Sequence, residues 1–210
     1  MSLISRGDRQ SSLSPLCSLV TCISRSESTQ ASIDIASKLT YKIKKEGNHP
    51  KLAMRKSSIY VDTSVVGGCC DQEFQEWSNG LLADIKAGKF SLFLSELSDA
   101  EVQDAPEEVR KIYLEFRNCA KRILELSSEA IELADAYLNH GILTPNYRND
   151  ARHIALATIA GVDVLVSWNF KHVVHFEKIQ KFNAVNIEMG YKPISIFSPR
   201  EVTTYGGQGN

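Results

Sequence analysis

The chain has 210 residues, 43% of them hydrophobic and 23% charged, which is typical of a soluble globular protein with one well-buried domain. No apolar run approaches the roughly 20 residues that a membrane helix needs, so we expect no membrane partner. Five cysteines without a CxxC pair argue against a disulfide framework or a zinc site. The net charge of -1 is uninformative as a total, but residues 54–210 are mildly acidic and so give no long-range attraction to nucleic acid.

Charge and composition divide the chain near Met54. Residues 1–53 hold eleven serines and eight Lys or Arg against four Asp or Glu, whereas residues 54–210 hold sixteen Lys or Arg against twenty-one acids. We predict that residues 1–53 are a low-complexity, disordered N-terminal extension, or that the true start is Met54 and these residues are misassigned. A transit peptide is an alternative. The folded domain is expected to span residues 54–205, followed by a flexible tail at 206–210.

From Ile59 onward, short apolar runs alternate with helical patterns. The predicted strands are Ile59–Val61, Phe90–Leu94, Val162–Ser167 and Ile194–Phe197. The predicted helices are Phe74–Ile85, Ala100–Asp104, Glu107–Phe116, Cys119–Leu126, Ala130–Asn139 and Ala151–Ala160. This alternation is typical of an α/β fold in which a central parallel sheet is flanked by helices on both faces.

Three acidic residues stand at the ends of these elements. Asp62 closes the first strand, Glu101 follows the second, and Asp150 precedes a strongly helical segment. The carboxyl ends of parallel strands form the edge where ligands usually bind, and a helix N-terminus keeps a carboxylate ionised. Carboxylates gathered from distant segments favour a hard cation, Mg²⁺ or Mn²⁺.

Each acid also has a purely structural interpretation. Asp150 fits a helix cap, Asp62 fits an Asx turn with Thr63 and Ser64, and Glu101 fits a solvated helix face. It is their order and setting together that favour a common site.

Four segments in order resemble a PIN domain, and the resemblance covers about Ser58 to Val202. They are Tyr60-Val61-Asp62-Thr63-Ser64, Ser95-Glu96-Leu97 leading to Glu101, Asn149-Asp150-Ala151-Arg152-His153-Ile154-Ala155-Leu156-Ala157, and Ser167-Trp168-Asn169-Phe170-Lys171-His172. The resemblance implies a Rossmann-like PIN fold and a metal-dependent endoribonuclease that hydrolyses RNA phosphodiester bonds, similar to VapC-type toxins of toxin–antitoxin pairs.

The resemblance also implies the roles of individual residues. Metal binding falls to Asp62, Glu101 and Asp150, which are catalytic together with Asn169. Thr63, Ser64 and Lys171 are expected to contact substrate or support the acids. Asn169 stands where many members have a fourth acid, and its missing charge puts a second metal ion in doubt.

The implied partners are RNA, a cognate antitoxin that masks the acids with a basic side chain, and a second copy of the chain in a homodimer. The implied location is the cytoplasm. The alternative is a catalytically inactive PIN-like module that binds RNA or a partner protein, which Asn169 and the acidic domain favour. A phosphatase of the haloacid dehalogenase class is disfavoured because Ser64 stands where a second Asp is required.

Overall fold

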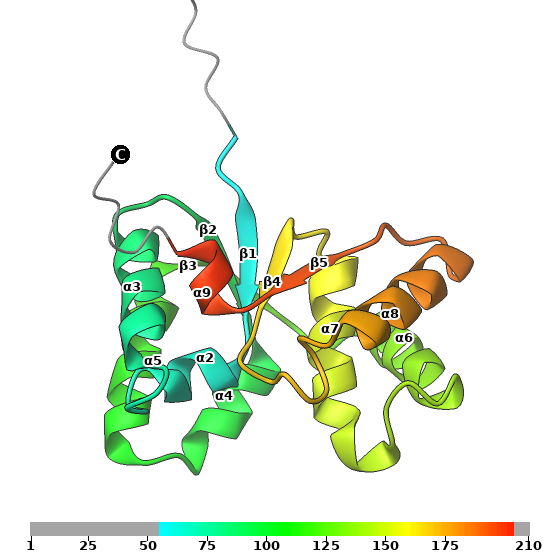
Figure 1. Ribbon diagram of the computed structural model, residues 1–210, viewed down its shortest axis with the longest axis horizontal. Coiled ribbons are helices and arrows are strands. Elements are labelled where there is room, and N and C mark those ends of the chain that lie inside the picture. Colours follow the sequence, from blue (N-terminus) through cyan, green and yellow to red (C-terminus); the bar gives the residue numbers. More distant parts are fainter. Residues whose placement is uncertain (1–54, 204–210) are drawn as a thin grey trace, which may run out of the picture. The chain divides into compact units, whose positions relative to one another are not determined.

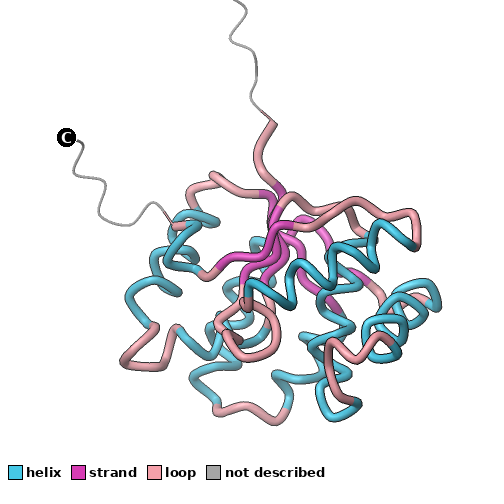
Figure 2. The backbone as a smooth tube through the Cα atoms, turned by 45° about the vertical axis from the view of Figure 1, so that its right-hand side comes forward, coloured by secondary structure: helices cyan, strands magenta, loops and turns pink. Residues whose placement is uncertain are grey.

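The structure is a computed structural model that describes residues 55–203, so the predicted N-terminal extension and C-terminal tail lie outside the described residues. Five strands form one sheet in the order β3-β2-β1-β4-β5. All four strand pairs are parallel, and helices surround the sheet (Figure 2). The strands are β1 (Ser58–Val61), β2 (Ser91–Ser95), β3 (Ala120–Leu124), β4 (Val164–Val166) and β5 (Ser195–Phe197). The predicted α/β class with a flanked parallel sheet is confirmed.

Helices cover both faces of the sheet and create two hydrophobic cores (Figure 1). One face carries α2 (Thr63–Gly68), α3 (Gln75–Lys86), α4 (Glu96–Gln103), α5 (Glu107–Cys119) and α9 (Pro199–Val202). The other carries α6 (Ser128–Asn139), α7 (Arg148–Ile159), which follows the 3-10 turn η1 (Pro145–Tyr147), and α8 (Phe176–Glu188). Because strand side chains alternate between faces, Ile59 and Val61 enter the first core while Tyr60 enters the second.

No helix within residues 55–203 combines the length and the apolar character needed to cross a membrane.

Most predicted helices and strands are confirmed, but the prediction for residues 119–126 is wrong. The sequence pattern there predicts a helix, whereas residues 120–124 form the edge strand β3. Pairing with β2 decides its conformation, because strand formation depends on tertiary neighbours more than on local propensity. Helix α8 was not predicted from the sequence. Its Phe182 and Val185 are buried, while Phe176 and Ile187 are exposed. Because apolar residues lie on both sides of this helix, the sequence shows no clear 3.6-residue hydrophobic period.

The order of the strands creates a crevice beside β1. The chain passes from β1 outward through β2 to β3, and then returns to the other side of β1 with β4 and β5. Val61 at the end of β1 pairs with Val166 at the end of β4. In open parallel sheets, such a reversal of strand order leaves a crevice at the carboxyl ends, where ligands bind. The residues that follow β1 and β4 therefore face a common space.

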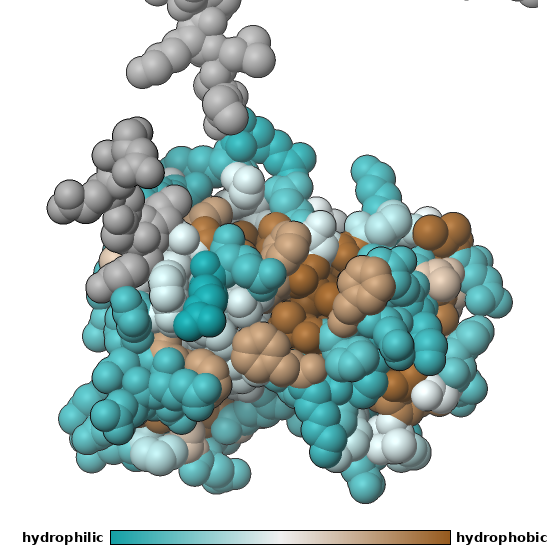
Figure 3. All heavy atoms as spheres, in the orientation of Figure 1, coloured by the Kyte–Doolittle hydropathy of each residue, from teal (hydrophilic) through white to brown (hydrophobic). Residues whose placement is uncertain are grey.

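Edge strand β5 is partly exposed. It buries Ile196 in the core formed with α6, α7 and α8 but exposes Ser195 and Phe197. Phe170 and Phe176, which precede and begin α8, are 49% and 76% exposed. Figure 3 shows apolar side chains gathered near the middle of the face of the molecule that it presents.

Substitutions at two adjacent glycines of α2 can test how tightly this helix packs against the segment after β4. A Cβ at Gly68 would lie 2.6 Å from Ser78 Oγ and 2.7 Å from Trp168 Nε1, whereas a Cβ at Gly67 would meet nothing within 4 Å. We expect Gly68→Ala to lower the free energy of unfolding by about 1–3 kcal/mol through overpacking. Gly67→Ala should be neutral or raise it by about 0.5–1 kcal/mol. Urea unfolding measures both values, and equal stabilities of the two variants would contradict the packing.

Candidate active site

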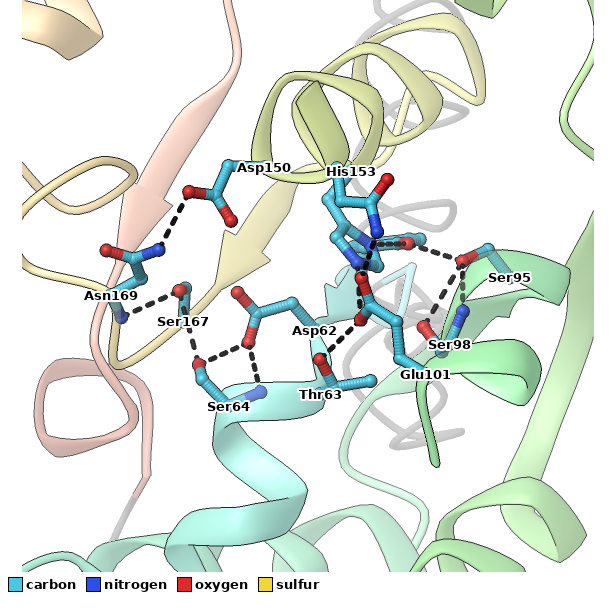
Figure 4. Close-up of polar contacts among 12 residues, drawn as sticks. Asp62, Thr63, Ser64, Ser95, Ser98, Glu101, Asp150, His153, Ser167 and Asn169 are labelled. Atoms are coloured by element: carbon cyan, nitrogen blue, oxygen red, sulfur yellow. Dashed lines mark hydrogen bonds and ion pairs between the residues drawn. The ribbon is translucent and has the colours of Figure 1, made fainter. Parts of the chain in front are cut away.

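A cavity of about 490 Å³ opens at the carboxyl edge of the sheet and contains every predicted site residue except one. Its lining includes Asp62, Thr63, Ser64, Glu101, Asp150 and Asn169. Figure 4 shows these side chains, from four separate segments, directed toward a common space. The structure therefore brings the three predicted acids together at one edge of the sheet.

Asp62 is held by the helix that it begins. It directly follows β1 and is the N-cap of α2, where its Oδ1 accepts hydrogen bonds from the backbone N–H of Ser64, at 3.0 Å, and from the Ser64 hydroxyl. Asp62 is only 5% exposed. Burial raises the pKa of Asp62, and His153 and hydrogen bonds from Ser167 and Ser64 oppose that rise only in part. Asp62 is thus a fixed and incompletely compensated acid.

Glu101 is compensated more fully. Its Oε2 accepts a hydrogen bond from Thr63 Oγ1 at 2.6 Å and lies 3.1 Å from His153 Nε2, while its Oε1 accepts from Asn149 Nδ2 at 3.0 Å. Burial works against ionisation, but the contacts with His153, Thr63 and Asn149 outweigh it and lower the pKa of Glu101. The solvated helix face considered from the sequence is therefore wrong for this residue.

Asp150 lies in the first turn of α7, opposite the segment that follows β4. Its Oδ2 accepts a hydrogen bond from Asn169 Nδ2 at 3.1 Å. Asn169 is held in turn, since its backbone N–H donates to Ser167 Oγ at 3.0 Å. Burial raises the pKa of Asp150, and the negative charges of Asp62 and Glu101 add to the rise despite the hydrogen bond from Asn169. Asp62 and Asp150 therefore share an excess of negative charge.

His153 is a site residue that the sequence analysis missed. It is 3% exposed, and its Nδ1 lies 2.6 Å from the Tyr60 hydroxyl while Nε2 contacts Glu101. Burial raises the pKa of Tyr60, which keeps its hydroxyl protonated. The two ring nitrogens thus connect the Tyr60 hydroxyl to the Glu101 carboxylate. The available signal was spacing, because His153 follows Asp150 by three residues and so shares its helix face.

The segment after β4 contains one predicted site residue that lies away from the cavity. Lys171 is exposed and does not line the acidic cavity. The neighbouring Trp168 is packed inside the domain. Its indole N–H donates to Ser78 Oγ at 2.8 Å, and its ring lies 4.6 Å from that of Phe74.

The donor set suits a hard cation, although the acids do not form a closed cage. Within residues 55–203, no group of three or more His, Cys, Asp or Glu side chains is arranged to hold a metal ion. The reason is that Glu101 is directed to His153 and its other donors. Asp62 and Asp150 remain, with hydroxyl and amide oxygens around them. Two carboxylates completed by water and substrate phosphate are a usual ligand set for Mg²⁺.

Comparisons with known proteins give distant likenesses only. No family model matches the sequence, and no curated protein matches it. Similar solved structures include VapBC2 of Rickettsia felis bound to a DNA fragment from its promoter, at 15% identity and a TM-score of 0.44, covering 67% of this chain and 98% of that one. DNA-bound VapBC of Salmonella typhimurium has 15% identity, coverages of 68% and 98%, and a TM-score of 0.45. FitAcB of Neisseria gonorrhoeae has 15% identity, coverages of 69% and 99%, and a TM-score of 0.46.

Likenesses at this distance say nothing about activity or substrate. Membership of the PIN family stays a prediction that is based on the sequence motifs.

The pKa shifts of Asp62 and Glu101 are opposite, so replacing each acid by the corresponding amide residue should change the stability in opposite directions. The pKa of Asp62 is higher in the folded state than in the unfolded state. Ionisation of Asp62 therefore lowers the free energy of unfolding as the pH rises from the unfolded-state pKa to the folded-state pKa. In a chelator, Asp62→Asn should therefore be more stable than the parent protein at neutral pH. The gain should vanish at a pH below the unfolded-state value, as urea unfolding across pH would show.

Glu101→Gln should do the reverse. The pKa of Glu101 is lowered on folding, so its stabilising effect is present above the unfolded-state value and is lost as pH falls through the folded-state value. We expect the variant to lose about 1–2 kcal/mol at neutral pH, because a charged acceptor of several hydrogen bonds is removed. The same unfolding series measures it, and a gain in stability would contradict the hydrogen-bond assignment.

Proposed function

We propose that this protein is a metal-dependent endoribonuclease that hydrolyses RNA phosphodiester bonds in the acidic cavity. The observation that carries the proposal is the pair Asp62 and Asp150. Both carboxylates have raised pKa values, from burial and, for Asp150, from the charge of its neighbour, and both face one cavity beside the reversal of strand order. A divalent cation would relieve this excess charge, and Mg²⁺ or Mn²⁺ suits the oxygen donors.

Asp62 and Asp150 would hold the ion. When bound, it would lower the pKa of a water molecule and neutralise charge that develops on the phosphodiester. Ser64 fixes the direction of Asp62, and Asn169 fixes that of Asp150. Because Asn169 has no charge of its own, the pair is better matched to one ion than to two.

Glu101 would orient the attacking water. Its lowered pKa keeps it ionised at neutral pH, so it acts as a hydrogen-bond acceptor there. A carboxylate has about four acceptor positions, and Thr63, His153 and Asn149 use three of them. One position is left for a water molecule in the cavity. His153, which contacts Glu101 and is itself held by Tyr60, would keep Glu101 in place.

Removal of the Asp62 charge should abolish cleavage. The loss of several kcal/mol of transition-state stabilisation corresponds to a decrease in rate of about 10²–10³-fold. We expect this for Asp62→Asn in a cleavage assay with fluorescent RNA in Mg²⁺, and the parent protein should be equally inactive in a chelator. Asp104→Asn, the same substitution at an exposed position of the neighbouring segment, is the matched control and should cleave normally. Undiminished cleavage by the Asp62→Asn protein would refute the assignment.

Metal binding can be measured without activity. Mg²⁺ or Mn²⁺ should raise the melting temperature of the parent protein in proportion to RT ln(1 + [L]/Kd), because the folded state alone presents the paired acids. Asp62→Asn and Asp150→Asn should each melt at a temperature that does not respond to the metal. A parent protein that neither responds to the ions nor cleaves any RNA would favour the alternative, a catalytically inactive module that binds RNA or a protein.

The resemblance to VapC-type toxins extends the proposal to a toxin with a cognate antitoxin. The excess negative charge at Asp62 and Asp150 would be masked by a basic side chain of such a partner. Expression of the parent protein should then arrest growth, Asp62→Asn should not, and the product of an adjacent short reading frame should relieve the arrest. Homodimerisation, which light scattering tests, and the cytoplasmic location stay predictions.

A further inference from the structure

The two sides of the acidic cavity carry opposite charge. On the side of α4 and the start of α5, residues 96–108 contain six Asp or Glu and no Lys or Arg, although two of these acids, Asp99 and Glu107, are paired with Arg117 and Lys111 of α5. On the other side, residues 171–181, from the loop after β4 into α8, contain three lysines and two histidines against a single Glu. A polyanion that enters the cavity is therefore repelled on one side and attracted on the other.

The lysines of residues 171–181 are not neutralised by the rest of the domain. None of them forms an ion pair with an acid within residues 55–203. Six other Lys or Arg side chains in this part of the chain do form ion pairs with acids, such as Lys111 with Glu107 at 2.8 Å and Arg148 with Asp135 at 2.8 Å. The basic side thus keeps its full charge for an external anion.

Lys178 is held in place by its neighbours. Its Nζ donates to the backbone oxygen of Lys171 at 2.9 Å and lies 3.3 Å from His172 Nδ1. The His172 ring is stacked on Tyr147, with 3.6 Å between centroids and 28° between planes. An ammonium group has three donors, of which these contacts use two, so one is left for a phosphate oxygen.

This cluster is attached directly to the acidic cavity. The backbone N–H of His172 donates to Asn169 Oδ1 at 3.0 Å, and the same Asn169 donates to Asp150. Tyr147 comes just before α7, on which Asp150 lies. The Tyr147–His172 stack is therefore adjacent to the Asp150–Asn169 hydrogen bond. A strand with a phosphate at the acids could place a flanking phosphate at Lys178.

We infer that Lys178, supported by the Tyr147–His172 stack, is a phosphate-binding site for single-stranded RNA, and that the strand leaves the cavity over residues 171–181. The inference rests on the proposed function for the location of the scissile bond. It assigns the route of the substrate to one side of the cavity only. Lysine contacts with phosphates give nucleic-acid binding a large part of its affinity, whatever the base sequence.

The experiment compares Lys178→Gln with Lys111→Gln. Both remove one lysine charge, but Lys178 is half-buried, whereas Lys111 is exposed, belongs to α5 on the acidic side and is paired with Glu107. Fluorescence anisotropy with a short fluorescein-labelled single-stranded RNA, in a chelator so that no metal-dependent cleavage occurs, gives the dissociation constants of the full-length proteins. We expect Lys178→Gln to bind about 5–30-fold more weakly. The slope of log K against log salt should decrease by about 0.7, the value for one lost phosphate contact.

Lys178→Arg keeps the charge and should restore most of the affinity, while Lys111→Gln should bind like the parent protein. Equal affinities of the Lys178→Gln and Lys111→Gln proteins, or no RNA binding by the parent protein, would overturn the inference. The outcome is separate from that of the proposed function. Binding that depends on Lys178 without any cleavage supports this site and refutes the nuclease, whereas cleavage with an unchanged KM in Lys178→Gln does the reverse.

Discussion

Carboxylates that are removed from water must be compensated, and in this protein the compensation is unequal. Glu101 receives hydrogen bonds from Thr63, His153 and Asn149, and its pKa falls. For Asp62, which is more deeply buried, and for Asp150, which accepts a hydrogen bond from Asn169, burial prevails and the pKa values rise. The protein thus spends part of its folding stability on keeping two acids near one another, which is a common property of functional sites. The proposed cation and the proposed basic partner follow from this excess of negative charge, and the proposed RNA depends on that cation, because the acids alone would repel it.

The fold makes this arrangement through the adjacency of β1 and β4. Their parallel pairing ends at Val61 and Val166, so the next residues of each strand, Asp62 and Ser167, lie at the same edge. Behind Asp62, helix α2 packs so closely against the segment after β4 that Gly68 leaves no room for a Cβ beside Trp168. Trp168 serves this packing, and the next residue, Asn169, is thereby aimed at the cavity. Rigid packing of these neighbours explains how short loops can position a precise site.

Beyond the acids, the surface of the domain is divided into parts of different character. Residues 96–108 are acidic, residues 171–181 are basic, and three phenylalanines, Phe170, Phe176 and Phe197, are exposed. A polynucleotide needs cations next to the acids, whereas exposed aromatic side chains are typical of surfaces that contact other molecules. The nearly neutral net charge of the chain conceals this division. Local charge, and not the total, decides where a polyanion can lie.

The sequence by itself determined the α/β class and the candidate acids. Apolar runs alternating with helical periods predict a parallel sheet, and residues at the ends of such runs must lie at its carboxyl edge. Asp62, Glu101 and Asp150 could be found in this way, because their positions depend only on local elements. The motifs of the PIN resemblance added Asn169, which no period would have selected.

Only the tertiary structure decided which groups compensate the acids. His153 contacts Tyr60 and Glu101, which are 93 and 52 residues away in sequence, and no local pattern encodes such distances. Strand β3 was predicted as a helix, because its conformation depends on pairing with β2. Helix α8 was missed, because its place depends on the burial of one of its sides. Local spacing predicts periodic elements and their ends, but the partners of a buried polar group depend on how those elements pack together.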